Sequence, residues 1–222
     1  MMNYKKFMTH KNFMKRIVAI VLGSLLSLAT AAQQNPQVAL KTDLGTIVIE
    51  LYPKEAPITV ANFLEYVDSK FYDGTIFHRV IPGFVVQGGG MDFQFAGRAT
   101  RDPIKNESNN GLKNEYKTLS MARTNDPDSA TSQFFINLRA NPSLDAKENK
   151  PGYAVFGKVV EGMDVVEKIV AEPRGMFRAF PDAPNYAVRI LNATRVDKNN
   201  REAEKKDSLK NSNVSDALVP RS

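Results

Sequence analysis

The chain has 222 residues, enough for one well-buried domain with extensions at its ends. It contains no Cys, which excludes disulfides, thiol nucleophiles and zinc–thiolate sites. Its formal charge of +6 comes mostly from residues 1–31, which hold five basic residues and no acidic one, so the rest has 25 basic and 24 acidic residues. Because such a balance does not favour binding to phosphates, we expect no nucleic-acid partner.

Residues 1–31 have the three parts of a secretory signal peptide. A basic segment ends at Lys15-Arg16, an apolar run follows over 17–29, and Ala29-Thr30-Ala31 provides the small residues that cleavage requires. The apolar run is shorter than the ~20 residues with which a helix spans a bilayer, and an uncleaved anchor is the alternative. We therefore expect removal of residues 1–31 and no stable membrane insertion.

The next residues predict a β-hairpin followed by a helix. Residues 38–42 alternate in polarity, 43–45 can turn, and 46–51 are rich in β-branched side chains. From Thr59 the apolar residues recur at i, i+3, i+4 and i+7, and Pro57 stands just before or within the first helical turn. The apolar face of this helix consists of Val60, Phe63, Leu64 and Val67.

The stretch 77–90 is mostly apolar, yet it carries Arg79 and Gln87. The Pro-Gly pair at 82–83 divides it into two short extended runs, because Pro fixes φ and Gly permits a turn. Alternation along the first run places Phe77 on the same face as Arg79. A cation and an amide among apolar side chains need partners, which a substrate or internal carbonyls could supply. The pattern alone leaves both alternatives open.

A second strand is predicted over residues 132–138. Its alternation places Gln133, Phe135 and Asn137 on one face, while the opposite face is apolar and suits a core. An aromatic ring between two amides could hold a peptide, and an ordinary half-buried strand is the alternative. Further strands are predicted over 118–122, 153–160 and 186–196, with a second helix over 163–170 and loops over 91–112 and 139–152.

Many short strands with two helices predict a mainly β fold, an antiparallel barrel within residues 32–196. Residues 197–222 are charged and have few large apolar side chains, which predicts a disordered tail. The final LVPRS is either native or the remnant of a protease site.

Five motifs, in this order, resemble the cyclophilin family of peptidyl-prolyl isomerases, most closely its bacterial periplasmic branch. They are FHRVIPGF at 77–84, QGG at 87–89, SMA at 120–122, SQFFI at 132–136 and VFGKV at 155–159. The resemblance covers roughly residues 38–196. It implies an eight-stranded, closed antiparallel barrel capped by two helices.

The resemblance also implies which residues act on a substrate. Arg79 would be the catalytic arginine, and Gln87 would bond the substrate backbone. The implied catalytic set is Arg79, Phe84, Gln87 and Phe135. The implied substrate-binding set, which lines the proline pocket and its neighbouring subsite, is Val85, Ala122, Arg123, Gln133, Leu144 and Tyr153.

Three positions depart from the family pattern. Val85 replaces a common Met, Tyr153 stands where many relatives carry His, and Ser143 stands where relatives place an aromatic residue at the pocket rim. None of these changes removes the arginine. Because the drug cyclosporin packs on the rim aromatic in relatives, we expect this chain to bind cyclosporin weakly.

The mechanism that the resemblance implies is a hydrogen bond from the arginine to the prolyl nitrogen in the twisted transition state. An apolar pocket holds the proline ring, and the reaction needs no nucleophile, general base, metal or cofactor. We therefore expect a peptidyl-prolyl cis-trans isomerase that acts as a monomer on proline-containing polypeptides. Its substrates would be exported proteins that fold in the periplasm.

Two rival functions use the same residues. A binding module for proline-containing peptides, or a holdase, could use the same pocket with catalysis incidental. A hydrolase built on His78 is weaker, because on a strand that residue faces away from Arg79 and no serine motif accompanies it. His10 lies in the expected signal peptide, so the single remaining His excludes a multi-histidine metal site.

Overall fold

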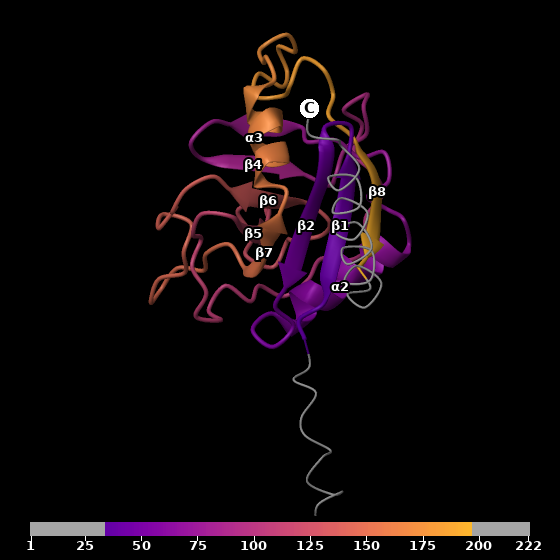
Figure 1. Ribbon diagram of the computed structural model, residues 1–222. Coiled ribbons are helices and arrows are strands. Elements are labelled where there is room, and N and C mark those ends of the chain that lie inside the picture. Colours follow the sequence, from indigo (N-terminus) through magenta and orange to yellow (C-terminus); the bar gives the residue numbers. More distant parts are fainter. Residues whose placement is uncertain (1–33, 197–222) are drawn as a thin grey trace, which may run out of the picture. The chain divides into compact units, whose positions relative to one another are not determined.

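The computed structural model describes residues 34–196. The chain divides into two units at Gln34 and Asn35, and the helices and strands of the described residues all belong to the second unit. The expected signal peptide and tail lie outside the described residues, so the domain boundaries stay predictions. The elements (Figure 1) are β1 (Gln37–Thr42), β2 (Gly45–Leu51), α2 (Pro57–Asp68), β3 (Arg79–Ile81), β4 (Val85–Gly88), β5 (Thr118–Met121), β6 (Phe134–Asn137), β7 (Val155–Glu161), α3 (Met163–Ala171) and β8 (Ile190–Arg195).

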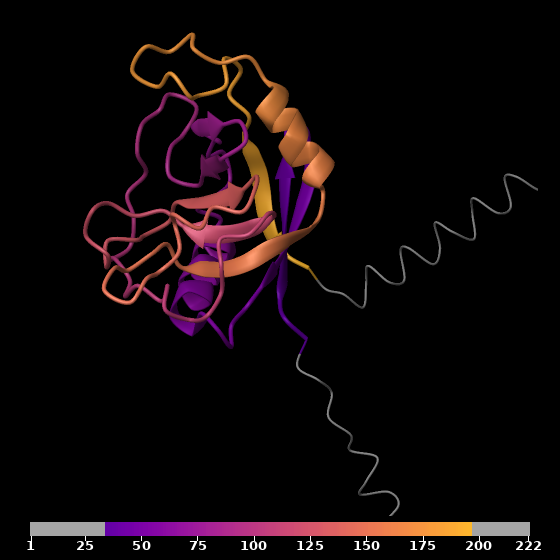
Figure 2. The same ribbon diagram turned by 90° about the vertical axis from the view of Figure 1, so that its left-hand side faces the viewer.

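All eight strands form one antiparallel sheet in the order β3-β4-β6-β5-β7-β2-β1-β8. The sheet curls, and α2 and α3 lie at opposite ends of it (Figures 1 and 2). Strands β3 and β8 are the two edges of this sheet. Ile76, which precedes β3, and Arg189, which precedes β8, form an isolated β-bridge. The mainly β, two-helix fold is confirmed, whereas the expected closed barrel is not, because the strand ladder stays open.

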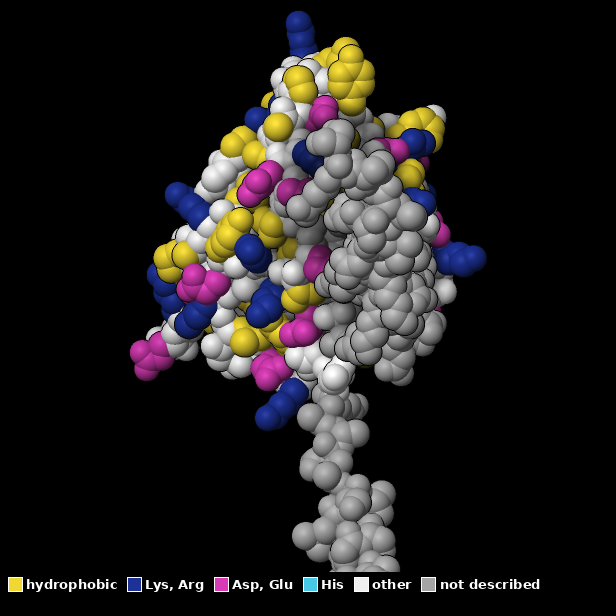
Figure 3. Space-filling view, in the orientation of Figure 1, with side chains coloured by type: hydrophobic (Ala, Val, Ile, Leu, Met, Phe, Trp, Pro, Cys, Tyr) yellow, Lys and Arg dark blue, Asp and Glu magenta, His cyan; other side chains and the backbone are white. Residues whose placement is uncertain are grey.

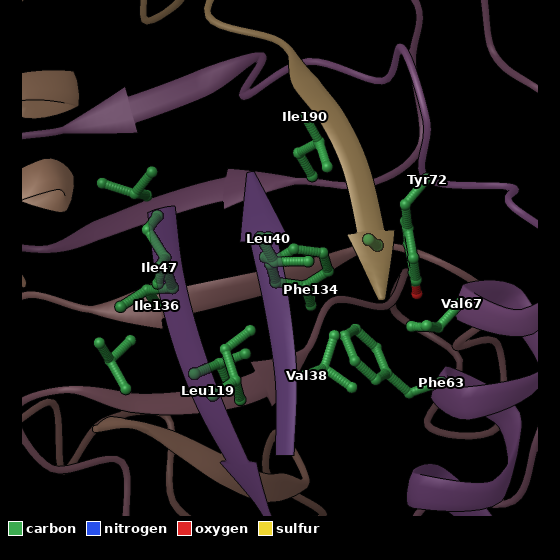
Figure 4. Close-up of a cluster of buried hydrophobic side chains, with 14 of the residues drawn as sticks. Val38, Leu40, Ile47, Phe63, Val67, Tyr72, Leu119, Phe134, Ile136 and Ile190 are labelled. Atoms are coloured by element: carbon green, nitrogen blue, oxygen red, sulfur yellow. The ribbon is translucent and has the colours of Figure 1, made fainter. Parts of the chain in front are cut away.

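Helix α2 covers one end of the core. The four apolar residues predicted for its inner face are all buried, and the Phe63 ring lies 5.1 Å from Tyr72 and 5.6 Å from Phe134 (Figure 4). The helix begins at Pro57, where a missing N–H costs nothing. The next two backbone N–H groups, of Ile58 and Thr59, donate to the Glu107 carboxylate at 3.0 and 2.8 Å, which satisfies this end of the helix.

The first hairpin is the one that the sequence predicts. Strands β1 and β2 pair in register from Gln37–Glu50 to Thr42–Gly45. Gly45 has a φ of +136°, and a Cβ there would lie 2.7 Å from the Val165 side chain of α3. A glycine at this turn therefore lets α3 pack closely on the hairpin.

Strand β3 is shorter than the sequence predicts, and its first expected residue lies on the other side of the sheet. The strand begins at Arg79, and Phe77 is fully buried in the core, 6.5 Å from the Phe134 ring. The prediction that Phe77 and Arg79 share a face is wrong, because regular alternation does not extend to residues ahead of the strand.

Within residues 34–196, no helix is both long enough and apolar enough to cross a membrane.

Candidate active site

A cavity of about 220 Å³ lies against β3, β4 and β6 and the loops beside them. Nine of the ten predicted site residues line it: Arg79, Phe84, Val85, Gln87, Ala122, Arg123, Phe135, Leu144 and Tyr153. The tenth, Gln133, accepts a hydrogen bond from one of these nine, Gln87. The structure thus brings the whole predicted set together, while the role of each residue stays a prediction.

Strand pairing explains why three polar and aromatic side chains meet here. Arg79 of β3 pairs with Gln87 of β4, which pairs with Phe135 of β6. Directly paired residues of antiparallel strands share a face, so the three side chains form a row across the sheet. The alternate residues, Val80 and Val86, point into the core and are at most 1% exposed. Because one face of these strands is buried in the core, the strand register is fixed, and with it the positions of the site side chains on the opposite face.

The polar side chains of the row are hydrogen-bonded to one another. Arg79 Nη1 donates to Gln87 Oε1 at 3.3 Å, and Gln87 Nε2 donates to Gln133 Oε1 at 2.9 Å. Arg79 Nε also lies 3.7 Å from a carboxylate oxygen of Asp182. Among the residues that the structure describes, none accepts a hydrogen bond from Arg79 Nη2, and the side chain is 41% exposed. One edge of the guanidinium is therefore free to donate to a ligand.

The apolar wall of the cavity is held by aromatic contacts. Phe135 is 4% exposed and Val85 2% exposed, and the Phe135 ring meets Tyr153 edge-on at 5.6 Å. Arg123 lies 4.6 Å from the centre of the Tyr153 ring and donates to the Pro151, Gly152 and Thr124 carbonyls. Arg123 therefore braces the segment that carries Tyr153 as well as bordering the pocket.

A family model described as "Cyclophilin type peptidyl-prolyl cis-trans isomerase/CLD" matches residues 37–195, from the first residue of β1 to the last of β8. The chain belongs to this family. The cyclophilin is 53% identical over 178 residues to the peptidyl-prolyl cis-trans isomerase of Acinetobacter baylyi, covering 80% of this chain and 94% of the relative. It is 45% identical to peptidyl-prolyl cis-trans isomerase A of Dickeya dadantii, covering 85% of this chain and 99% of that protein.

Solved structures agree with the fold of this cyclophilin. A cyclophilin-type isomerase of Cryptosporidium parvum superposes with a TM-score of 0.62 at 27% identity, covering 73% of this chain and 98% of that chain. The same protein was also solved in the presence of the dipeptide Ala-Pro, and that structure superposes with a TM-score of 0.61 at 27% identity, covering 72% of this chain and 99% of that chain.

A buried asparagine cluster lies beneath the cyclophilin pocket. Asn137 of β6 is fully buried, donates to Asn114 Oδ1 at 3.2 Å and accepts from Asn141 Nδ2 at 2.8 Å. Asn141 Nδ2 also donates to the carbonyl of Phe84, while Asn114 Nδ2 donates to the carboxylate of Asp145, next to the pocket residue Leu144. The interpretation of Asn137 as part of a peptide-holding surface is wrong, because its side chain is fully buried and bonded to Asn114 and Asn141.

His78 does not supply a nucleophile–base pair. It is 6% exposed, and burial lowers its pKa to about 4, with a further lowering by the charge of Arg79. Among the described residues, the buried His78 Nδ1 and Ser132 Oγ both lack a hydrogen-bond partner, so these two groups do not bond to each other. The geometry therefore gives no support to the hydrolase alternative.

Within residues 34–196, no group of three or more His, Cys, Asp or Glu residues could hold a metal ion.

Two larger hollows lie elsewhere on the described surface, and each contains an arginine that is already tied to a carboxylate. The first, about 820 Å³, contains Arg101, which pairs with Glu65. The second, about 680 Å³, contains Arg189, which pairs with Asp43 at 2.8 Å. Figure 3 shows hydrophobic side chains at the surface in the upper part of the molecule, where the segment between α3 and β8 lies. The predicted site residues thus line the smallest of these three hollows, in which the guanidinium lies beside an apolar wall.

Sequence reasoning missed Asp182, the acidic neighbour of Arg79. It lies about one hundred residues away in the chain, in the segment between α3 and β8, ahead of the strand predicted over 186–196. No spacing or periodicity in that segment indicates a contact with β3.

Proposed function

We propose that this cyclophilin accelerates rotation about peptide bonds that precede proline in polypeptide substrates. The observation that carries the proposal is the position of the Arg79 guanidinium beside the apolar wall of a small cavity, with Nη2 making no hydrogen bond to another described residue. The names of the relatives and the Ala-Pro dipeptide present with the Cryptosporidium parvum protein support the same substrate class.

The proposed chemistry is differential binding of the transition state. Amide resonance gives the bond a barrier of about 18–20 kcal/mol. When the bond twists, the prolyl nitrogen regains a lone pair, to which Arg79 Nη2 can donate, whereas the planar nitrogen of the ground state accepts poorly. An interaction gained only in the transition state raises the rate. A charge-assisted bond contributes about 1.5–3 kcal/mol, so the rest must come from fixed geometry and a poorly solvated site.

Apolar and amide side chains share the task of holding the substrate. Phe84, Phe135 and Leu144 would contact the proline ring while the preceding carbonyl rotates. Gln87 uses one N–H for Gln133 and one acceptor site for Arg79. An amide has two N–H donors and two acceptor sites, so Gln87 keeps one N–H and one acceptor site for the substrate backbone.

The Arg79→Ala variant tests the proposal in a protease-coupled assay on X–Pro peptides. We expect kcat/KM to fall at least about tenfold, which corresponds to about 1.4 kcal/mol of transition-state stabilisation. Arg101→Ala removes an arginine from the larger hollow and should leave kcat/KM unchanged. An unchanged rate in folded Arg79→Ala would contradict the mechanism. If the unmutated protein binds X–Pro peptides without accelerating their rotation, the binding-module alternative holds instead.

We further propose that the protein is exported and acts as a monomer on proteins that fold in the periplasm. The support is the basic segment, the apolar run and the small-residue site within residues 1–31, which lie outside the described residues. Mass spectrometry of the exported protein should find an N-terminus near Ala32, and finding Met1 would contradict the proposal. Sedimentation of the same sample should give the mass of one chain.

A further inference from the structure

The segment between α3 and β8, residues 172–189, carries a carboxylate to the arginine of the pocket. Asp182 Oδ2 lies 3.7 Å from Arg79 Nε, and both side chains are about half exposed, at 48% and 41%. We propose that Asp182 is a positioning residue, which orients the Arg79 guanidinium toward the prolyl nitrogen of the substrate. This inference rests on the proposed function of Arg79.

The backbone that carries Asp182 is fixed at several points. The Val80 N–H of β3 donates to the Asp182 carbonyl at 2.8 Å, and Ala183, which is fully buried, donates to the Phe180 carbonyl at 3.0 Å. The Phe180 ring in turn stacks on Phe95 at 4.6 Å with an interplanar angle of 16°. The carboxylate therefore projects from an anchored turn, and its place beside Arg79 is set by the fold.

The three nitrogen atoms of the Arg79 guanidinium have different surroundings. Nε faces Asp182 and Nη1 donates to Gln87, whereas Nη2 makes no hydrogen bond within residues 34–196. Because a guanidinium is planar and rigid, two anchors on neighbouring nitrogens fix its plane and aim the third. With one anchor removed, a side chain this exposed would rotate toward water, and fewer molecules would hold the donor in line.

The pair of Arg189 with Asp43 shows the contrast. There both Nε and Nη2 donate to the carboxylate, at 3.1 and 2.8 Å, so the carboxylate occupies both donors on that side of the guanidinium. At Arg79 the carboxylate is more distant and faces Nε, so it can orient the group without occupying the donor that the reaction needs.

A double-mutant cycle tests the inference. Asp182→Asn should lower kcat/KM about 3- to 10-fold in the unmutated background, through kcat more than KM. In the Arg79→Ala background, at enzyme concentrations high enough to measure residual turnover, the same change should have an effect below about 1.5-fold. Equal losses in both backgrounds, or no loss in the first, would overturn the inference, because a general structural role would act in either background.

Two further measurements separate the possible failures. Nitrogen-15 relaxation of Arg79 Nε should report a more mobile side chain in Asp182→Asn, with an unchanged melting temperature, and an unchanged relaxation would overturn the inference. Glu172→Gln, which changes a carboxylate of the same segment away from Arg79, should leave turnover and relaxation as they are. If Arg79→Ala loses activity and Asp182→Asn does not, the positioning role alone fails; if Arg79→Ala keeps full activity, the proposed mechanism fails.

Discussion

Arg79 and His78 are neighbours in the chain, yet they lie in opposite environments. The Arg79 side chain is 41% exposed and faces the pocket, whereas His78 is 6% exposed and faces the interior. The first residue of β3 thus carries a charge to the pocket, while the residue before the strand is a buried ring. Burying a protonated imidazole there would be costly, and this cost links folding stability to pH.

We predict that the free energy of unfolding decreases as the pH is lowered from about 6.5 to about 4. The pKa of His78 is lowered from 6.5 to about 4 in the folded state, so the unfolded chain binds a proton in this range and the folded chain does not. The loss should approach about 1.4 kcal/mol per pH unit. Denaturant unfolding at several pH values measures it. His78→Gln should flatten the slope, and a ring titration near pH 6.5 by NMR would contradict the prediction.

Ser143 is exposed and directly precedes Leu144 of the pocket wall. We predict that Ser143→Trp tightens cyclosporin binding roughly 20-fold to several-hundredfold. A Trp can bury about 150–250 Å², a third of which is worth about 1.3–2 kcal/mol, and its N–H can add a bond of about 0.5–1.5 kcal/mol. Calorimetry should show this gain while isomerase activity changes little. Nanomolar inhibition of the unmutated protein would show that the assignment of Ser143 to the rim is wrong.

At the scale of elements, β6 connects the pocket to the interior through both of its faces. Phe134 and Ile136 are fully buried in the core, Phe135 lines the cavity, and Asn137 holds the asparagine cluster beneath it. The chain leaving this strand, the segment of Asn141, is tied to the carbonyl of Phe84 and so to the start of β4. The shape of the pocket therefore depends on buried amides as well as on its apolar walls.

We predict that Asn137→Ala lowers the free energy of unfolding by about 1–3 kcal/mol, because buried donors and acceptors of its partners lose a bond. Denaturant midpoints measure the loss. Asn149→Ala removes an exposed amide from the loop over 139–152 and should stay within about 0.5 kcal/mol of the unmutated protein. Equal stability of the two variants would show that the cluster contributes nothing.

Sequence patterns were informative where one period ran through a whole element. The spacing of Phe63 and its neighbours predicted α2, and alternation predicted the buried face of β6. Alternation failed for Phe77 because the strand begins only at Arg79, and it misplaced Asn137 because period two gives a face without saying what covers it. The contact of Asp182 depends on tertiary folding between distant segments, which no local pattern encodes.

For the molecule as a whole, the described part ends with β8, an edge strand that pairs with β1. The Val196 N–H donates to the Gln37 carbonyl at 2.9 Å, and Arg195 pairs with Asp68 of α2 at 2.5 Å. A truncation after Val196 would therefore keep every contact of β8 that the structure shows.

We predict that removal of residues 197–222 shifts the melting temperature by less than about 2 °C and leaves turnover unchanged. The segment offers few large apolar side chains to offset the entropy of ordering it. Differential scanning calorimetry and the isomerase assay measure both quantities. Truncation before Ile190, which removes β8, should abolish folding and serves as the positive control. A large loss from the shorter truncation would show that the tail binds to the domain.

The exposed position of Ser143 also has an optical consequence. The chain contains no Trp, so its ultraviolet emission comes from tyrosine. The Ser143→Trp variant would carry a single indole, placed beside the mouth of the pocket, with no other indole to contribute background. When a peptide or cyclosporin binds and covers that ring, its emission wavelength would shift away from the value of an indole in water. Ligand binding and release could then be followed in real time, without an attached dye.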